Sequence, residues 1–164
     1  MNAVELYNPS DVYAAHVLWG ANCGPAALAA VLGRELSGVR ELFPRFPDKP
    51  WCNPTQMKAA IDAAGVPWSV LNRQFNPRSP KPVLAFLQIE GPWCAPGVPI
   101  GAAYRHTHWV GLSGPMVYDV NFAEWLTSVD WATEIMPLIL AGTKGATGWS
   151  VRTRIELDLS EGTT

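Results

Sequence analysis

The apolar positions of the chain are most concentrated in residues 21–33, which read ANCGPAALAAVLG. Pro25 suits the first turn of a helix and is followed by seven residues that are all Ala, Leu or Val. Asn22 is a favourable N-cap and Gly33 a favourable stop. The pattern therefore predicts a buried helix of about three turns that begins at or near Cys23.

A second helix is predicted over residues 53–66 by its capping residues and its apolar face. Asn53 is a favourable N-cap, Pro54 suits the first helical position, and Gln56 stands at the capping-box position. Gly65 is expected to end the helix. The predicted apolar face consists of Met57, Ala60, Ile61 and Ala64.

Weaker patterns surround these two helices. Residues 1–20 mix polar and apolar types and are expected to be irregular. Residues 37–43 are expected to form a short helix capped by Ser37, and residues 44–54 a proline-rich loop.

The apolar runs in the second half of the chain predict strands. Residues 83–89 (VLAFLQI) are typical of a buried strand, and residues 106–121 predict a hairpin that turns at Ser113-Gly114-Pro115. Helices followed by an antiparallel sheet predict an α+β fold. The remaining expectations are a strand over 66–71, a loop over 72–82, irregular chain over 90–101, a partly helical segment over 122–140 that Pro137 ends or bends, and a final strand over 148–159.

Composition limits the class of protein. Hydrophobic residues make up 48% and charged residues 16% of the 164 residues, which predicts one globular domain over residues 1–164. A net charge of −2 and scattered basic residues argue against a nucleic-acid partner. No apolar run is long enough to cross a bilayer, and residues 1–11 contain acids and no apolar stretch. We therefore expect a cytoplasmic protein with no membrane partner.

Cys23 is the first candidate for chemistry. A thiol at a helix N-terminus lies at the positive end of the helix dipole, which favours the thiolate. The competing interpretation is that Cys23 is a core residue, because cysteines beside apolar helices usually are. Together with Cys52 and Cys94 it lacks the paired spacings of a zinc site, so we expect free thiols and no metal or cofactor. A bridge between Cys52 and Cys94 is the alternative.

A nucleophilic cysteine needs a base, and the chain has three histidines. His108 opens an apolar strand, so its ring is expected to project from the sheet into a cleft. His106 precedes it by two residues, and His16 lies in the segment before Cys23. The competing interpretation of His108 is a hydrogen-bonded histidine of the sheet.

The hairpin register decides which group orients the base. If the turn has Gly114 and Pro115 at its tip, Leu112 pairs with Val117, and a shift of one residue would turn the polar groups away. Residues that are directly or diagonally paired share a face. The side chains that this register brings to the His108 ring are Asp119 and Asn121, and the sequence leaves both as candidates.

Three motifs together, NCGPAALAAVLG, HWVGL and VYDVN, resemble papain-like cysteine peptidases and most closely their C39-like branch. In that family a Cys begins the central helix, a His opens a strand far downstream, and an Asp or Asn follows on the next strand. The resemblance covers about residues 15–125 in layout. It implies a papain-like fold with Cys23 as nucleophile, His108 as general base and acid, and Asp119 as the orienting residue.

The chain departs from this family at one position. The family has a Gln six residues before the Cys that donates to the oxyanion, whereas this chain has Val17 there. The backbone N–H of Cys23 lies at a helix N-terminus and can still donate. The side chains available as a second donor are Asn22, the Trp19 indole and His16.

The expected function is that of a thiol hydrolase which cleaves a peptide or related amide bond in a peptide or protein substrate. Two alternatives use the same fold, because a fold does not fix the reaction. One is a catalytically weakened module that binds a peptide or protein, and the other is an acyltransferase or transglutaminase-type enzyme. Trp93 and Trp109 are expected either to line the cleft or to pack in the interior.

Overall fold

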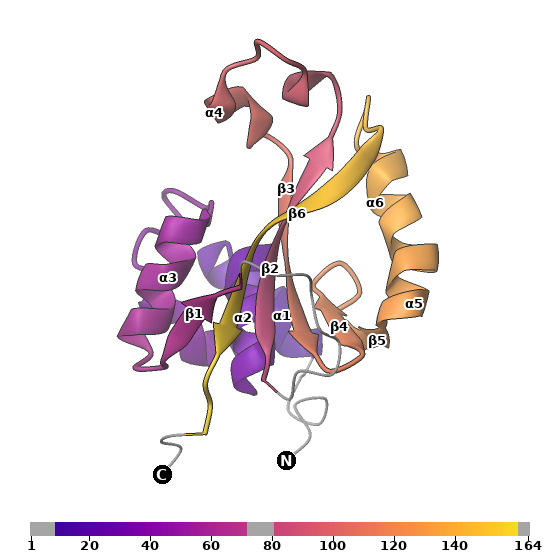
Figure 1. Ribbon diagram of the computed structural model, residues 1–164. Helices are drawn as coiled ribbons and strands as arrows, with labels where there is room; N and C mark the ends of the chain where they lie inside the picture. Colours follow the sequence, from indigo (N-terminus) through magenta and orange to yellow (C-terminus); the bar gives the residue numbers. More distant parts are fainter. Residues whose placement is uncertain (1–8, 72–80, 161–164) are drawn as a thin grey trace.

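The computed structural model describes residues 9–71 and 81–160, which form an α+β fold around one antiparallel sheet (Figure 1). The predicted α+β class is confirmed, and most of the loop expected over 72–82 lies outside the described residues. The strands are β1 (Trp68–Val70), β2 (Val83–Glu90), β3 (Thr107–Ser113), β4 (Met116–Asp119), β5 (Glu124–Thr127) and β6 (Gly148–Leu157).

Helices lie on both faces of this sheet, whose strand order is β1-β6-β2-β3-β4-β5. In Figure 1 the indigo-to-magenta helices cover one face, and orange α5 and α6 lie along the other. The helices are α1 (Pro9–Trp19), α2 (Cys23–Leu32), η2 (Leu36–Leu42), α3 (Pro54–Ala63), η3 (Pro92–Cys94), α4 (Ile100–Ala103), α5 (Ser128–Asp130), the π-helical turn η4 (Trp131–Ile135) and α6 (Met136–Gly142).

Strand β2 is buried on both faces, as the apolar run 83–89 predicts. Leu84 and Phe86 belong to the core shared with α1, α2 and α3. Ala85, Leu87 and Ile89 alternate with them and belong to the core under η4 and α6. The period of two along a strand therefore distributes one apolar run between two separate hydrophobic cores.

Helix α2 crosses the sheet at very close range. A Cβ added at Gly111 of β3 would stand 2.8 Å from Cγ1 of Val31 and 3.4 Å from the carbonyl oxygen of Ala27. The small residues that fill the interior of α2 are buried. Glycine at position 111 therefore lets the backbone of β3 lie directly against α2, which fixes where the first residue of α2 is placed.

The predicted ends of the two long helices are confirmed. The Asn22 side chain accepts a hydrogen bond from the Gly24 N–H, and Gly33 takes the left-handed conformation that ends α2. At the start of α3, Asn53 and Gln56 form the reciprocal capping box. These ends depend on local residues, which is why the sequence locates them.

The irregular chain expected for residues 1–20 is wrong for its described part, because residues 9–19 form α1. Only Ala15 and Trp19 of this helix are fully buried, and its apolar residues do not form a stripe. The cap predicted at Ser37 is also wrong. The first N–H of η2, that of Leu36, donates to the carboxylate of Asp11 in α1, a contact between segments far apart in sequence.

The segment 122–140 is only partly helical, as predicted, but it also contains the strand β5, which was not predicted. Pro137 does not end the helical part, since α5, η4 and α6 continue to residue 142. The Met136 N–H bonds to the carbonyl of Trp131, five residues back. This wider turn lies directly before Pro137, so the helix accommodates a residue without an N–H donor.

We predict that Gly111→Ala destabilises the protein by about 1–3 kcal/mol, the usual cost of overpacking a core. The added methyl group would force α2 away from β3, because the backbone carbonyl of Ala27 cannot move aside without shifting the helix. Urea unfolding measures the change. Gly101→Ala is the matched control, since a Cβ there meets nothing within 4 Å. Equal stability of the two variants would contradict the close packing.

Candidate active site

Cys23 is the first residue of α2, is partly exposed as a whole residue, and lines an open cavity. Asn22 links this end of the helix to the loop that precedes α3, because its side-chain Nδ2 donates to the Pro50 carbonyl at 2.7 Å. A Cβ on Gly24 would stand 2.7 Å from the Cβ of Cys52, so the loop lies directly against the first turn. The loop before α3 therefore contacts both Asn22 and Gly24, the residues on either side of Cys23.

His108 lies near the start of β3, where β3 extends beyond its partner β4. Leu112 pairs with Val117, which confirms the predicted hairpin register. The continuation of this register places Asp119 diagonally opposite His108. Nε2 of His108 donates to Oδ2 of Asp119 at 2.9 Å, and the Cys23 thiol is close enough to the ring for each group to shift the pKa of the other. One ring therefore joins the thiol to the carboxylate.

Asp119 is fully buried and accepts three N–H donors. Besides His108, the Trp131 indole donates to Oδ2 at 2.9 Å, and the backbone N–H of Asn121 donates to Oδ1 at 3.0 Å. Of the two candidates for orienting His108, the structure places Asp119 against the ring. Asn121 instead contacts the carboxylate through its backbone.

Trp131 is the residue at this site that sequence reasoning missed. Its indole reaches Asp119 because it begins the π-helical turn η4, which packs against the opposite face of the sheet from α2. Turns of this kind are frequent at functional sites. The residue pattern around Trp131 shows only a mixed segment, and nothing in it marks a contact with a strand twelve residues earlier.

Two opposing effects set the protonation of Cys23. Burial is the largest effect and would raise its pKa, but the hydrogen bond and charge of His108, with the backbone N–H of Trp109, outweigh burial and lower it. Burial instead dominates at Cys52 and raises the pKa of that thiol. Cys23 is therefore the better nucleophile of these two at neutral pH.

The His108–Asp119 pair is held in its charged form. Burial would lower the pKa of His108, but its hydrogen bonds with Asp119 and Cys23 raise it to about 10. Burial would also raise the pKa of Asp119, yet its bonds from His108 and Trp131 lower it below the ordinary value. The protonation states of Cys23, His108 and Asp119 are thus coupled to one another.

An open cavity of about 540 Å³ lies beside Cys23 and His108. Its other walls include Tyr13 and His16 from α1 and Asn121 after β4. Among the residues that the structure describes, none that lines it is Lys, Arg, Asp or Glu. Apart from Cys23 and the two histidines, the described lining is therefore uncharged.

Several residues expected near the site lie elsewhere. Trp109 is buried, and its indole donates to the Cys52 carbonyl, so it packs in the interior and does not line the cleft. Trp93 packs against His106 with the rings tilted and their centroids 4.4 Å apart, and neither lines the cavity beside Cys23. Trp19 is buried against Phe46 and is also outside that cavity.

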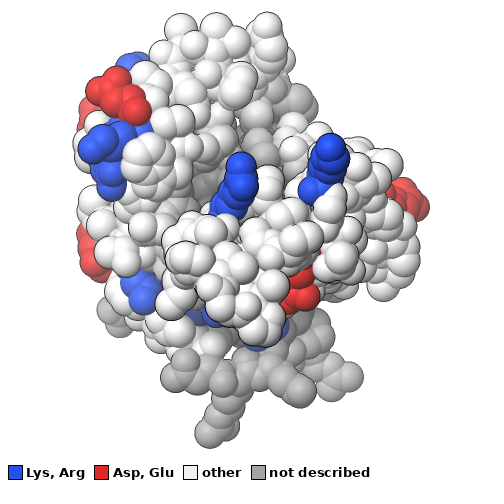
Figure 2. Space-filling view, turned by 90° about the horizontal axis from the view of Figure 1, so that it is seen from above, with Lys and Arg blue, Asp and Glu red and all other residues white. Residues whose placement is uncertain are grey.

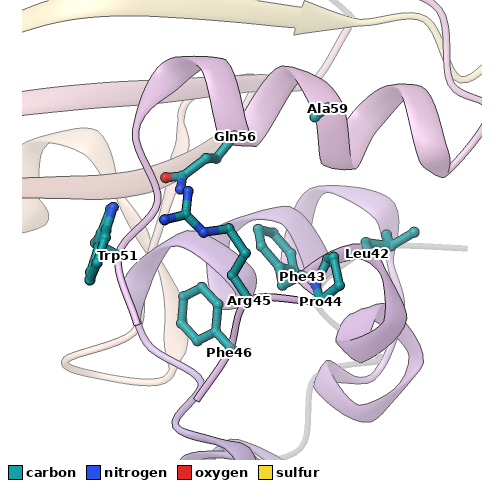
Figure 3. A pocket seen from close by; sticks show the side chains of 8 residues that line it. All are labelled: Leu42, Phe43, Pro44, Arg45, Phe46, Trp51, Gln56 and Ala59. Carbon is teal, nitrogen blue, oxygen red and sulfur yellow. The ribbon is translucent and has the colours of Figure 1, made fainter. Parts of the chain in front are cut away.

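A second, smaller cavity of about 130 Å³ is mainly apolar (Figure 3). Arg45 extends toward Gln56 in this view, and its guanidinium lies 5.2 Å from the centre of the Trp51 ring. The described residues that line it include no nucleophile and no metal ligand. On the face seen in Figure 2, basic and acidic residues are interspersed among uncharged ones.

Comparison of the chain with family models, with curated proteins and with solved structures finds no match. Within residues 9–71 and 81–160, no three His, Cys, Asp or Glu side chains gather as metal ligands. In the same ranges, none of the helices has the length and apolarity needed to cross a bilayer. The geometry of the site itself must therefore support any functional assignment.

We predict that Asp119→Ala lowers the pKa of His108, because it removes the hydrogen bond and the negative charge that raise it. The imidazolium would then lose its proton at lower pH than in the unchanged protein. NMR titration of the ring measures this shift. Asn121→Ala is the matched control, since alanine keeps the backbone N–H that contacts Asp119. Unchanged titration in Asp119→Ala would rule out the pair.

Proposed function

We propose that this protein is a papain-like cysteine hydrolase that cleaves peptide or related amide bonds. The observation that carries the proposal is the His108 ring, which hydrogen-bonds to Asp119 and interacts electrostatically with Cys23 beside an open cavity. A nucleophile, a base and a group that orients the base are the parts that acyl transfer requires.

The three groups would act in sequence. The Cys23 thiolate attacks the substrate carbonyl carbon, and the His108 imidazolium then gives its proton to the leaving amine as the C–N bond breaks. His108, now neutral, takes a proton from water, which attacks the thioester. The acid is released and Cys23 is restored. Asp119 holds the ring and stabilises its charged form throughout.

A peptide is the substrate class that the cavity favours. The described walls beside Cys23 contain no Lys or Arg, so they suit a neutral backbone and uncharged side chains better than a phosphate or a polyanion. An acyltransferase or transglutaminase-type reaction would share the first half of this sequence, with an amine in place of water. The cavity is open, so either water or an amine can reach the Cys23 thioester. Hydrolysis requires no acceptor other than water.

One observation favours a second candidate, a module that binds peptides with weakened catalysis. The position at which related peptidases have a Gln is Val17, and this side chain is 63% exposed and does not line the cavity. Loss of one oxyanion donor typically costs about 10²–10³ in rate. A binding module would retain peptides beside Cys23 without cleaving them.

We predict that the protein cleaves a mixture of unmodified peptides and that Cys23→Ala abolishes this cleavage. Mass spectrometry of new peptide termini measures it. The substitution should leave the free energy of unfolding within about 1 kcal/mol, because Cys23 is partly exposed.

Cys52→Ala is the control, and it should cleave like the unchanged protein. Cleavage that survives Cys23→Ala would refute the proposal. Peptides that bind without being cut would favour the binding module. A loss of several kcal/mol in Cys23→Ala would instead indicate that the thiol serves packing.

A further inference from the structure

His16 lies in the last turn of α1 and lines the same cavity as Cys23 and His108. Its ring is fixed by a contact between Nδ1 and the Ala21 carbonyl oxygen, at 3.2 Å. A carbonyl oxygen only accepts, so Nδ1 carries the hydrogen and donates. This contact leaves Nε2 as the polar atom of the ring that is available to a ligand in the cavity.

The proposed reaction creates a need that Nε2 of His16 can meet. Attack of the thiolate moves the carbonyl π electrons onto oxygen, and the resulting oxyanion is stabilised by hydrogen-bond donors. The first N–H groups of a helix have no partner within it, so the backbone N–H of Cys23 supplies one donor. A second donor must come from the cavity wall.

Two other side chains that the sequence offers for this role are less suited to it. Trp19 is buried and does not line the cavity. Asn22 does line it, but its amide is held at both ends, since Oδ1 accepts from the Gly24 N–H and Nδ2 donates to the Pro50 carbonyl. His16 is the side chain among these three that lines the cavity with a ring nitrogen to spare.

We propose that His16, as the imidazolium, is the second oxyanion donor of this site, an inference that rests on the proposed function. Because Nδ1–H is engaged by Ala21, Nε2 carries a hydrogen only when the ring is protonated. The Nε2–H then donates to the oxygen as the carbon–sulfur bond forms. The same hydrogen bond is released when the tetrahedral intermediate collapses and the leaving group takes the proton of His108.

The titratable side chains that share the cavity with His16 are Tyr13 from its own helix, Cys23 from α2 and His108 from β3. The charges of Cys23 and His108 oppose each other, and Asp119 lies behind His108. The carboxylate of α1 itself, Asp11, is engaged by η2.

Two chemical probes distinguish stabilisation of the oxyanion from reactivity of the Cys23 thiolate. p-Nitrophenyl acetate acylates Cys23 through a tetrahedral oxyanion, whereas iodoacetamide alkylates the same sulfur by displacement at a saturated carbon, with no oxyanion. We expect His16→Ala to lower the acylation rate by about 10²–10³-fold and to leave the alkylation rate unchanged. Val17→Ala, at a neighbouring exposed position outside the cavity, should change neither rate.

The pH profile gives a readout that a structural role would not produce. The ratio of acylation to alkylation cancels the thiolate fraction, because both probes react with the same sulfur. In the unchanged protein this ratio should fall as pH rises, because a neutral ring whose Nδ1–H is engaged by Ala21 has no hydrogen on Nε2. In His16→Gln, whose amide N–H donates at every pH, the ratio should be independent of pH and exceed that of His16→Ala.

Equal acylation rates in His16→Ala and the unchanged protein would overturn the inference. So would a parallel loss of alkylation, which would indicate that His16 only positions the chain before Cys23. Failure of the proposed function has a different signature. In that case acylation and alkylation would both be as fast at Cys52 or Cys94 as at Cys23, whatever residue stands at position 16.

Discussion

The buried carboxylate of Asp119 is the constraint on which the rest of the site depends. A charge without solvent is costly unless it is paired and hydrogen-bonded, and Asp119 has three N–H donors, one of them from His108. This need favours the imidazolium, which in turn favours the thiolate of Cys23. The electrostatics of the Cys23 thiol therefore depend on a carboxylate that is buried and does not line the cavity.

The sheet brings together groups from layers that have separate hydrophobic cores. Cys23 comes from the helix packed on one face, and Trp131 from the π-helical turn packed on the other. His108 lies between them, where β3 extends beyond β4 and no neighbouring strand covers it on that side. A substitution that shifts α2 on one face, or η4 on the other, is therefore expected to alter the contacts among Cys23, His108 and Asp119.

The parts of the site that the sequence predicts are those set by local chemistry. Asn22 and Gly33 mark the ends of α2, and the turn at Gly114 fixes the register that brings Asp119 to His108. The resemblance of three short motifs to papain-like peptidases directs attention to the same residues. No comparison tests that resemblance, so the papain-like fold stays a proposal.

The parts that the sequence does not predict depend on contacts between distant segments. Helix α1 has no apolar stripe, so the pattern does not predict that His16 lies on a helix facing the cavity. Asp11 caps η2 across 25 residues, which no local signal shows. The indole of Trp131 reaches Asp119 only through a wider helical turn, which the sequence pattern does not encode locally.

The lowered pKa of Cys23 and the raised pKa of His108 predict a thiolate paired with an imidazolium in the resting protein. Ultraviolet absorbance of the thiolate, recorded through a pH titration, measures this directly. The account predicts a thiolate signal that persists below the ordinary range of cysteine, near pH 8.5, and disappears in Cys23→Ser. A signal that appears only in the ordinary range, or that is the same in Cys23→Ser, would contradict it.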